Sequence, residues 1–223
     1  MKNTKESIKY SILIPTRNRD LYVKYAIESV LSTNRNDIEL IVSNNHSTDN
    51  TEAYLSTLKD RRLRVIKPSK PLPMALHYEF VVSHAKGVWL TILGDDDAIM
   101  PYLFDRMDEL TAIFPDITII SSARAYYFWP GCSPELYGST AVIYSYNNKI
   151  QLRSTKKDLF RVLAGLRSCF DMPMIYTTCM VKRTLVEKIK ERTNGLFYQS
   201  IIPDMYSVVA LSLQVYAYCV LIW

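Results

Sequence analysis

Val88-Trp89-Leu90-Thr91-Ile92-Leu93-Gly94-Asp95-Asp96-Asp97 is the stretch that decides the fold of this chain. An apolar, β-prone run leads into a glycine and then into three adjacent carboxylates. The run predicts a strand buried on both faces, as in a parallel sheet, and Gly94 would let the backbone turn sharply where the strand ends. Because three like charges repel, two interpretations stand: an acidic surface turn, or a cation site that suits Mg²⁺ or Mn²⁺.

Composition indicates an ordinary globular protein. The 223 residues are 48% hydrophobic and 22% charged, which suffices for one substantial core, with or without an appendage. The net charge of +5 is spread without a dense Lys/Arg block, so a nucleic-acid partner is not expected, whereas an anionic substrate or a bilayer surface is compatible with it. The four cysteines are scattered without a CxxC motif, so neither a zinc site nor a disulfide framework is predicted.

The two ends of the chain bear on its location. Residues 1–9 are polar and lack the apolar core of a signal peptide, which favours the cytoplasm. Residues 205–223 contain no charged side chain, and we interpret them as a buried helix followed by a strand rather than as the start of a membrane-inserting segment. Because the chain stops within an apolar run, we expect the natural protein to continue.

Strand-like and helix-like patterns alternate along the first half. Strands are predicted at residues 10–14, 38–42 and 63–66, and Asp20 is placed to cap the first helix. A later strand is predicted at 175–181, and residues 124–148 resemble an insertion of strands and loops. This order indicates an α/β fold with a doubly wound, mostly parallel sheet, in which residues 1–122 and 123–223 form two halves of one domain.

Polar loops follow three of the predicted strands, at residues 16–19, 43–47 and 94–97. In open parallel sheets, ligands bind outside the carboxyl ends of the strands, where the strand order reverses. If the three carboxylates formed only an acidic surface turn, there would be no reason for two other polar loops to lie beside them. The convergence therefore favours a ligand site at the three carboxylates.

Four segments together resemble a family 2 glycosyltransferase of the GT-A fold. They are Ser11-Ile12-Leu13-Ile14-Pro15-Thr16-Arg17-Asn18-Arg19, Ala26-Ile27-Glu28-Ser29-Val30-Leu31, Glu39-Leu40-Ile41-Val42-Ser43-Asn44-Asn45-His46-Ser47-Thr48-Asp49-Asn50-Thr51, and His84-Ala85-Lys86-Gly87 with the acidic triplet, which looks like the DXD region of the family. Each segment is a weak signal alone, but the four occur in order and at the right spacing over the first half of the chain.

The resemblance implies a nucleotide-diphosphate sugar donor and a sugar passed to an acceptor hydroxyl. An inverting, metal-dependent reaction is expected, in the synthesis of a surface polysaccharide or lipid-linked glycan. The acceptor would then be a glycan or a lipid-linked molecule, and the protein could work at the inner surface of the membrane. Residues 1–122 would bind the donor, and residues 123–223 would bind the acceptor.

Particular residues inherit roles from this resemblance. In the first loop, Pro15, Thr16 and Arg17 would contact the nucleoside. Asn44 stands where the family often has an Asp that binds the base, and an amide can donate as well as accept. Asp97 would bind the Mg²⁺ or Mn²⁺ ion, while Asp95 and Asp96 would share contacts with the ribose or the donor sugar. Gly94 occupies a place where relatives often carry an acid.

Asp204 is the candidate catalytic base. It follows Pro203 and opens an apolar helix, as does the carboxylate that deprotonates the acceptor in the family. The alternative is that Asp204 is an ordinary helix N-cap. Asp171, which precedes another break at Pro173, is the second candidate.

Two other function classes remain open on the sequence. A sugar-1-phosphate nucleotidyltransferase also combines an α/β sheet with Mg²⁺, but it would want a Gly-rich loop after the first strand, and residues 15–19 contain no glycine. A nucleotide-binding or assembly module without transferase activity would keep the donor site and lack turnover.

Overall fold

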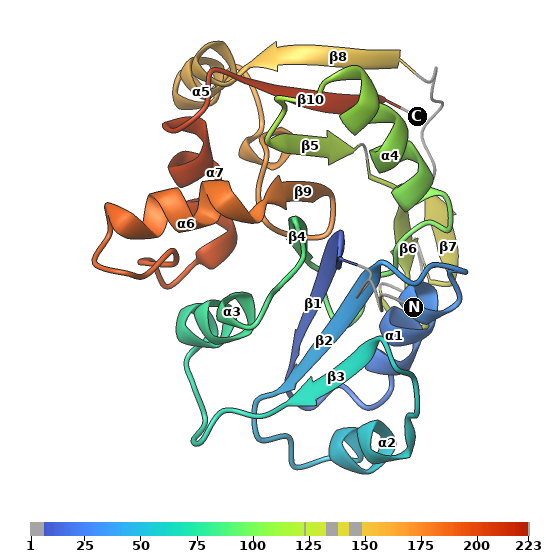
Figure 1. Cartoon of the computed structure of the whole chain (residues 1–223). Helices are drawn as coiled ribbons and strands as arrows, with labels where there is room; N and C mark the ends of the chain where they lie inside the picture. Colours follow the sequence, from blue (N-terminus) through green and yellow to red (C-terminus); the bar gives the residue numbers. More distant parts are fainter. Residues whose placement is uncertain (1–6, 123, 133–137, 143–148, 223) are drawn as a thin grey trace, which may run out of the picture.

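The computed structural model describes residues 7–122, 124–132, 138–142 and 149–222. A single large sheet runs through the molecule in the order β3-β2-β1-β4-β9-β5-β10-β8, and a separate pair, β6-β7, lies beside it (Figure 1). The strands are β1 (Tyr10–Thr16), β2 (Ile38–Asn44), β3 (Leu63–Ile66), β4 (Trp89–Ile92), β5 (Ile119–Ser122), β6 (Tyr126–Phe128), β7 (Thr140–Val142), β8 (Lys149–Ser154), β9 (Cys179–Lys182) and β10 (Ala217–Ile222).

Helices cover both faces of the large sheet. They are α1 (Val23–Leu31), α2 (Thr51–Thr57), α3 (Met74–Ser83), α4 (Leu103–Ile113), α5 (Thr155–Leu163), α6 (Arg183–Glu191) and α7 (Pro203–Ser212), with one 3₁₀ turn, η1 (Cys169–Asp171). In β1, Ile12 and Ile14 face a core shared with α1 and α4, whereas Leu13 faces a core shared with α3 and α6. The period-2 alternation of side chains along a strand thus fills two cores, which is why the central strands are mainly apolar on both faces.

Most of the expected architecture is confirmed. The first four strands pair in parallel, and β5 and β10 also pair in parallel. All four residues of β4 are buried, as the opening stretch predicts. The mostly parallel, doubly wound α/β class is therefore correct. The expected insertion at 124–148 supplies β6 and β7, and its residues 133–137 and 143–148 lie outside the described residues.

Two local predictions are wrong. Asp20 does not cap the first helix: the N-cap of α1 is Tyr22, and the Asp20 carboxylate instead accepts from Asn50. The strand predicted at 175–181 begins only at Cys179, because residues 175–178 form a loop in which the Thr177 amide donates to the Ile92 carbonyl oxygen at 2.6 Å. β9 is also antiparallel to both of its neighbours, β4 and β5.

The charge-free segment near the end of the chain is a helix followed by a strand, as expected. α7 packs on the second core through Leu211, and β10 pairs with β5 and β8. Across the described part of the chain, no helix combines the length and the apolar character that crossing a membrane requires.

Candidate functional site

The three polar loops meet because their strands are neighbours. β1 lies between β2 and β4, so the carboxyl ends of three parallel strands share one edge. Thr16 lies directly opposite Asn44 in the register, and the Leu93 amide continues the β4 ladder by donating to the Leu13 carbonyl oxygen at 2.8 Å. We call Thr16, Asn44 and the acidic triplet, which lie at these strand ends, the donor side.

Asp95 is fixed by the first loop. The Thr16 hydroxyl donates to Oδ2 of Asp95 at 2.7 Å, and Nε of Arg19 lies 3.5 Å from Oδ1. Burial raises the pKa of Asp95 to about 6, although Thr16 and Arg19 both lower it, and the neighbouring Asp96 adds to the rise. Burial therefore outweighs these two partners, and a further positive charge would stabilise the ionised form.

Asp97 is held from the other side by the loop before β9. Its Oδ2 accepts from the Thr177 hydroxyl at 2.6 Å, and burial, followed by the charge of Asp96, raises its pKa against the hydrogen bonds from Thr177 and Tyr176. Thr177 has a φ of 45°, which is unusual for a β-branched residue and costs conformational energy. Strain at this position accompanies the contact that orients Asp97.

Gly94 is required for space rather than for its backbone angle. The φ angle of Gly94 is not positive, so this position does not need glycine for a sharp backbone turn, contrary to the expectation from the sequence. A Cβ at this position would lie 2.3 Å from Oδ2 of Asp97 and 2.5 Å from the Tyr176 hydroxyl. No larger residue fits between these two groups in their present positions.

Asp204 lies in the first turn of α7. Pro203 occupies the start of the helix and Ile202 is the N-cap, so the interpretation of Asp204 as a simple N-cap is wrong. Its Oδ1 is buried and has no hydrogen-bond partner within the part of the chain that the structure describes, and burial raises the pKa of the carboxyl. A buried carboxylate oxygen without a donor is costly, and such groups are found where a ligand or a proton is received.

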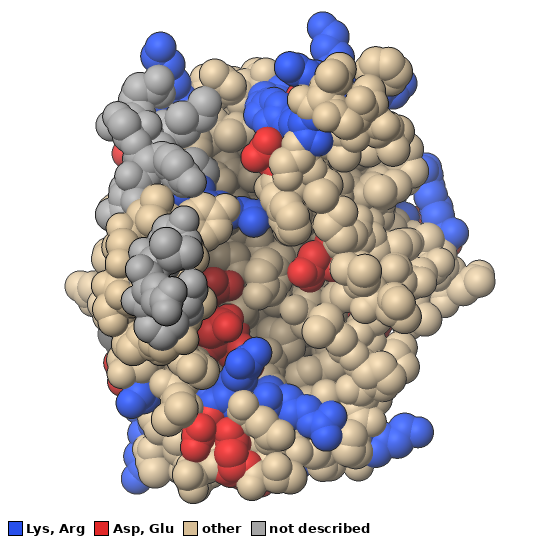
Figure 2. Space-filling view, turned by 180° about the vertical axis from the view of Figure 1, so that it is seen from behind, with Lys and Arg blue, Asp and Glu red and all other residues tan. Residues whose placement is uncertain are grey.

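Two tyrosines connect Asp204 with the donor side. Burial is the main cause of the raised pKa of Tyr78 and of Tyr176, and the charges of Asp204, Asp96 and Asp97 raise both further. The carboxylates at the strand ends and the carboxylate on α7 thus act on the same two phenols. Figure 2 shows a hollow on one face of the molecule in which acidic side chains lie, with Lys and Arg side chains around it.

The remaining residues predicted on the donor side differ in their environment. Asn44 is buried and its Oδ1 accepts from the Ser47 amide at 2.9 Å, so a contact with a base would come most directly from Nδ2. Pro15 is half-buried within β1, whereas Arg17 is exposed. The cation of this loop that reaches the acidic triplet is therefore Arg19, which lies 3.5 Å from Asp95.

Asp96 and Asp171 complete the set of predicted acids. The Asp96 carbonyl oxygen accepts from Nε1 of Trp129 at 3.3 Å, which joins the β6 segment to the acidic triplet. Trp129 also packs on Tyr22 and Tyr25 at the start of α1. Asp171 has a side chain that is 56% exposed and lies 3.6 Å from Nε of Arg167, so it lacks the burial that distinguishes Asp204.

The residues fit a cation that is shared with a substrate. Within the described residues, no three His, Cys, Asp or Glu side chains are grouped so that they could hold a metal ion. Mg²⁺ is often bound by only one or two carboxylates together with substrate phosphates, and hard oxygen ligands suit Mn²⁺ as well. The buried carboxylate of Asp97, with its raised pKa, matches such a site because a cation offsets the cost of ionisation.

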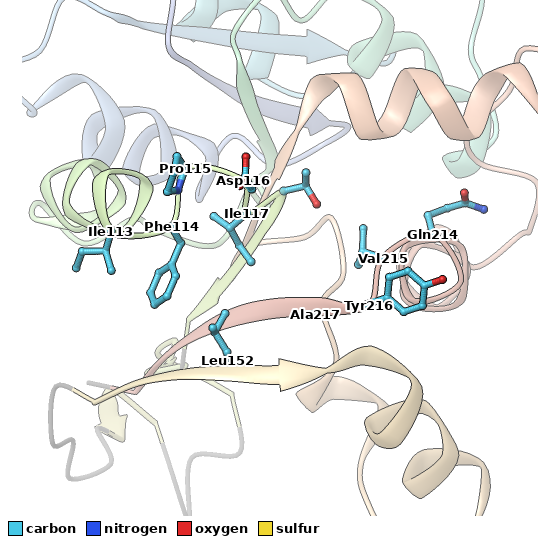
Figure 3. Close-up of a pocket in the computed structure, with 11 residues that line it drawn as sticks. Ile113, Phe114, Pro115, Asp116, Ile117, Leu152, Gln214, Val215, Tyr216 and Ala217 are labelled. Carbon is cyan, nitrogen blue, oxygen red and sulfur yellow. The ribbon is translucent and has the colours of Figure 1, made fainter.

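An open groove of about 610 Å³ elsewhere on the surface is not part of this site. Its lining comes from the end of α4, from β8 and from the start of β10, and includes Ile117, Leu152 and Tyr216 (Figure 3). It contains none of the acids at the strand ends and not Asp204. Its walls are mainly apolar, so it lacks the groups that would bind a diphosphate.

Sequence reasoning missed four residues of the site: Arg19, Tyr78, Tyr176 and Thr177. Arg19 lies in the first polar loop, in which the resemblance implies roles for Pro15, Thr16 and Arg17 but none for Arg19. Tyr176 and Thr177 were missed because the apolar run at 175–181 predicts a strand. Only the structure shows that the first residues of this run form a loop. Tyr78 lies on α3, where an aromatic residue is more commonly part of a core.

Comparisons with known proteins agree with the geometry. The model of the family described as Glycosyl transferase family 2 matches residues 11–189. A GalNAc(5)-diNAcBac-PP-undecaprenol beta-1,3-glucosyltransferase of Campylobacter jejuni is 30% identical over 96 residues, which are 41% of this chain and 31% of that protein. The chain spans about a third of the length of the first curated relatives it matches.

Solved structures share the fold at low sequence identity. TarS 1-349 of S. aureus has a TM-score of 0.69 and 14% identity, covering 96% of this chain and 58% of that one, and it has also been solved in complex with UDP-GlcNAc. The mannosyltransferase PcManGT of Pyrobaculum calidifontis, in complex with GDP-Man and Mn²⁺, has a TM-score of 0.60 and 15% identity, covering 95% and 56%.

Proposed function

Since the chain belongs to glycosyl transferase family 2, we propose that it transfers a sugar from a nucleotide-diphosphate sugar to an acceptor hydroxyl. Residues 1–122 bind the donor and residues 123–223 bind the acceptor in this proposal. The observation that carries it is that the acidic triplet at the strand ends and Asp204, whose Oδ1 is buried without a hydrogen-bond partner among the described residues, both raise the pKa of Tyr78 and Tyr176.

The donor side binds the nucleotide-diphosphate part. The loop of Pro15, Thr16 and Arg17 contacts the nucleoside, and Asn44 contacts the base. Asp95 and Asp96 receive hydroxyl groups of the ribose or the donor sugar. A Mg²⁺ or Mn²⁺ ion held by Asp97 would neutralise the charge that the departing diphosphate develops. The solved neighbour with GDP-Man and Mn²⁺ supports this assignment by analogy of fold.

Asp204 acts as the general base. Its carboxylate takes the proton of the acceptor hydroxyl while that oxygen bonds to the anomeric carbon and the bond from this carbon to the diphosphate oxygen breaks. Attack from the side opposite the leaving group inverts the anomeric centre. The raised pKa of Asp204 supports this role, because a base works best when its pKa approaches the working pH.

The acceptor in this proposal is a glycan or a lipid-linked molecule. The name of the Campylobacter jejuni relative describes transfer to an undecaprenol-linked glycan, which supports an acceptor of this class. The product would then be a surface polysaccharide or a lipid-linked glycan.

A donor screen tests the function. The thermal midpoint of the protein is measured with UDP, GDP and their sugars, each with and without Mn²⁺, because a ligand that binds the folded state raises the midpoint. The proposal expects a rise that needs both the ion and one nucleotide, followed by nucleotide release when an acceptor is added. A rise without any release would favour a nucleotide-binding or assembly module, and no rise with any donor would contradict the proposal.

A further inference from the structure

The outer side of α5 exposes an unusual concentration of apolar side chains. Phe160 is 69% exposed, Leu163 is 78% exposed and Leu166, just after the helix, is 69% exposed. Single exposed apolar residues are common on soluble proteins, but three within seven residues form a patch of the kind that marks an interaction site.

These side chains are not needed for the core. The inward side of α5 is formed by Leu159 and Val162, which pack on the small core of Met172, Met174 and Val208. The helix therefore already has a buried apolar stripe that holds it to the fold. Phe160 and Leu163 add a second apolar surface, and the fold gains no core packing from it.

The charges of α5 are sorted between its two sides. Its only acid, Asp158, is 5% exposed and is bound by Arg153 and Arg167, and it also accepts from the Tyr218 hydroxyl at 2.8 Å. The exposed charged side chains of α5 are Lys156, Lys157 and Arg161. The outer side thus combines apolar side chains with positive charge alone.

We propose that this α5 surface, formed by Lys156, Lys157, Phe160, Arg161, Leu163 and Leu166, docks the protein on an anionic lipid bilayer. The apolar side chains enter the boundary between headgroups and acyl chains, and the cations contact lipid phosphates. The charge sorting favours this occupant, because a surface with cations and no acid complements a negatively charged headgroup layer.

The location of this surface has a consequence for the acceptor. α5 packs against α7, whose first turn carries Asp204. A bilayer at α5 would bring a lipid-linked acceptor to the element that carries the base. This consequence rests on the proposed function, whereas binding to the bilayer does not require transferase activity.

Co-sedimentation with vesicles tests the proposal. The full chain is mixed with vesicles of phosphatidylcholine alone or with phosphatidylglycerol added, and we expect binding that needs the anionic lipid and weakens with salt. Phe160→Ser combined with Leu163→Ser should lower the partition coefficient by about tenfold or more, since each side chain loses its apolar transfer. Leu21→Ser is the matched control, because Leu21 is 67% exposed and lies in the loop before α1.

A second pair of substitutions tests the contribution of the positive charges separately from that of the apolar side chains. Lys157→Glu with Arg161→Glu should lower the partition coefficient by at least about twentyfold, because each juxtamembrane cation contributes about 1 kcal/mol. Arg61→Glu with Lys70→Glu, both exposed near β3 at the opposite edge of the sheet, is the control and should change it little.

Three outcomes would overturn the proposal. The first is equal binding to both kinds of vesicle, and the second is an equal loss of binding in the α5 variants and their controls. The third is a wild-type dimer that the α5 variants abolish, together with no binding of the protein to vesicles. The last outcome would assign the surface to contacts between copies of the chain. Circular dichroism and the thermal midpoint show whether each variant is folded. Vesicle binding and donor binding are measured separately, so each proposal fails or stands alone.

Discussion

The donor side and α7 hold their buried carboxylates in opposite ways. At the strand ends, Asp95 accepts from Thr16 and faces Arg19, and Asp97 accepts from Thr177. On α7, Oδ1 of Asp204 is buried, and none of the described residues donates a hydrogen bond to it. Burial is the main cause of the raised pKa of all three carboxyls, so the feature that separates them here is their hydrogen-bond partners.

This difference separates a binding role from a proton-transfer role. A carboxylate fixed by neighbours offers an oxygen in a defined direction, which suits a cation or a sugar hydroxyl. A carboxylate oxygen without a donor has an unused lone pair in a buried setting, which suits a proton. The four predictions that follow test this division, from the largest expected effect to the smallest.

Asp97→Ala should reduce transfer to background, at least about 10³-fold in kcat/KM. The change removes the carboxylate that is proposed to hold the cation and that accepts the hydrogen bond from Thr177. Donor binding, measured by the thermal shift in the presence of Mn²⁺, should be lost in parallel, while the midpoint of the ligand-free protein stays close to that of the wild type. Full activity in this variant, or of the wild type in EDTA, would remove the metal role.

Asp204→Asn should lower kcat by about 10²–10⁴-fold with little change in donor affinity. The amide keeps the size of the side chain but cannot take the proton. Asp171→Asn is the matched control, because Asp171 is the other candidate acid and is exposed. An equal loss of kcat and donor affinity in Asp204→Asn would assign the residue to structure, and a larger loss in Asp171→Asn would move the base to η1.

Gly94→Ala should lower kcat/KM by about 10²-fold, because a methyl group would displace both Asp97 and the Tyr176 hydroxyl from their present positions. Overpacking of this kind also costs about 1–3 kcal/mol of unfolding free energy. Tyr176→Phe removes the hydroxyl that the methyl group would meet, so the double variant should recover part of the stability lost by Gly94→Ala. Simple addition of the two losses would show that the residues do not share this space.

The donor side and α7 also differ in how well the sequence predicts them. The donor side lies on consecutive parallel strands, so the apolar runs and the polar loops that follow them predict its position. The fold class and the convergence of three loops were therefore predictable. The sequence predicts that Thr16 and Asp95, 79 residues apart, belong to one site, and the structure joins them by a hydrogen bond.

The part of the site that comes from residues 123–223 was less predictable because it depends on contacts distant in sequence. Thr177 reaches Asp97 across 80 residues, from a loop that an apolar pattern conceals as a strand. Nor does any local pattern reveal that β9 inserts antiparallel between β4 and β5. Asp204 could be selected as a candidate from Pro203 and the helix that follows, but only the structure distinguishes it from an N-cap.

The smallest expected effect concerns His77, an imidazole beneath the donor side. Nε2 of His77 lies 2.8 Å from the Ser43 hydroxyl, and burial lowers the pKa of His77 from 6.5 to about 4. Between those two pH values the unfolded chain binds a proton that the folded protein does not. The unfolding free energy should therefore fall as the pH falls from 6.5 toward 4, by up to about 1.4 kcal/mol per pH unit.

His77→Gln should remove this contribution to the slope while leaving donor binding nearly unchanged. Glutamine can still reach Ser43 but does not titrate, so the difference in stability between the two proteins should shrink from pH 7 to pH 5. Denaturant unfolding at several pH values measures it, with His84→Gln as the control for loss of an imidazole on the rim of α3. A strong loss of donor affinity in His77→Gln would instead mean that this buried layer contacts the substrate, and the donor side would then extend below the strand ends.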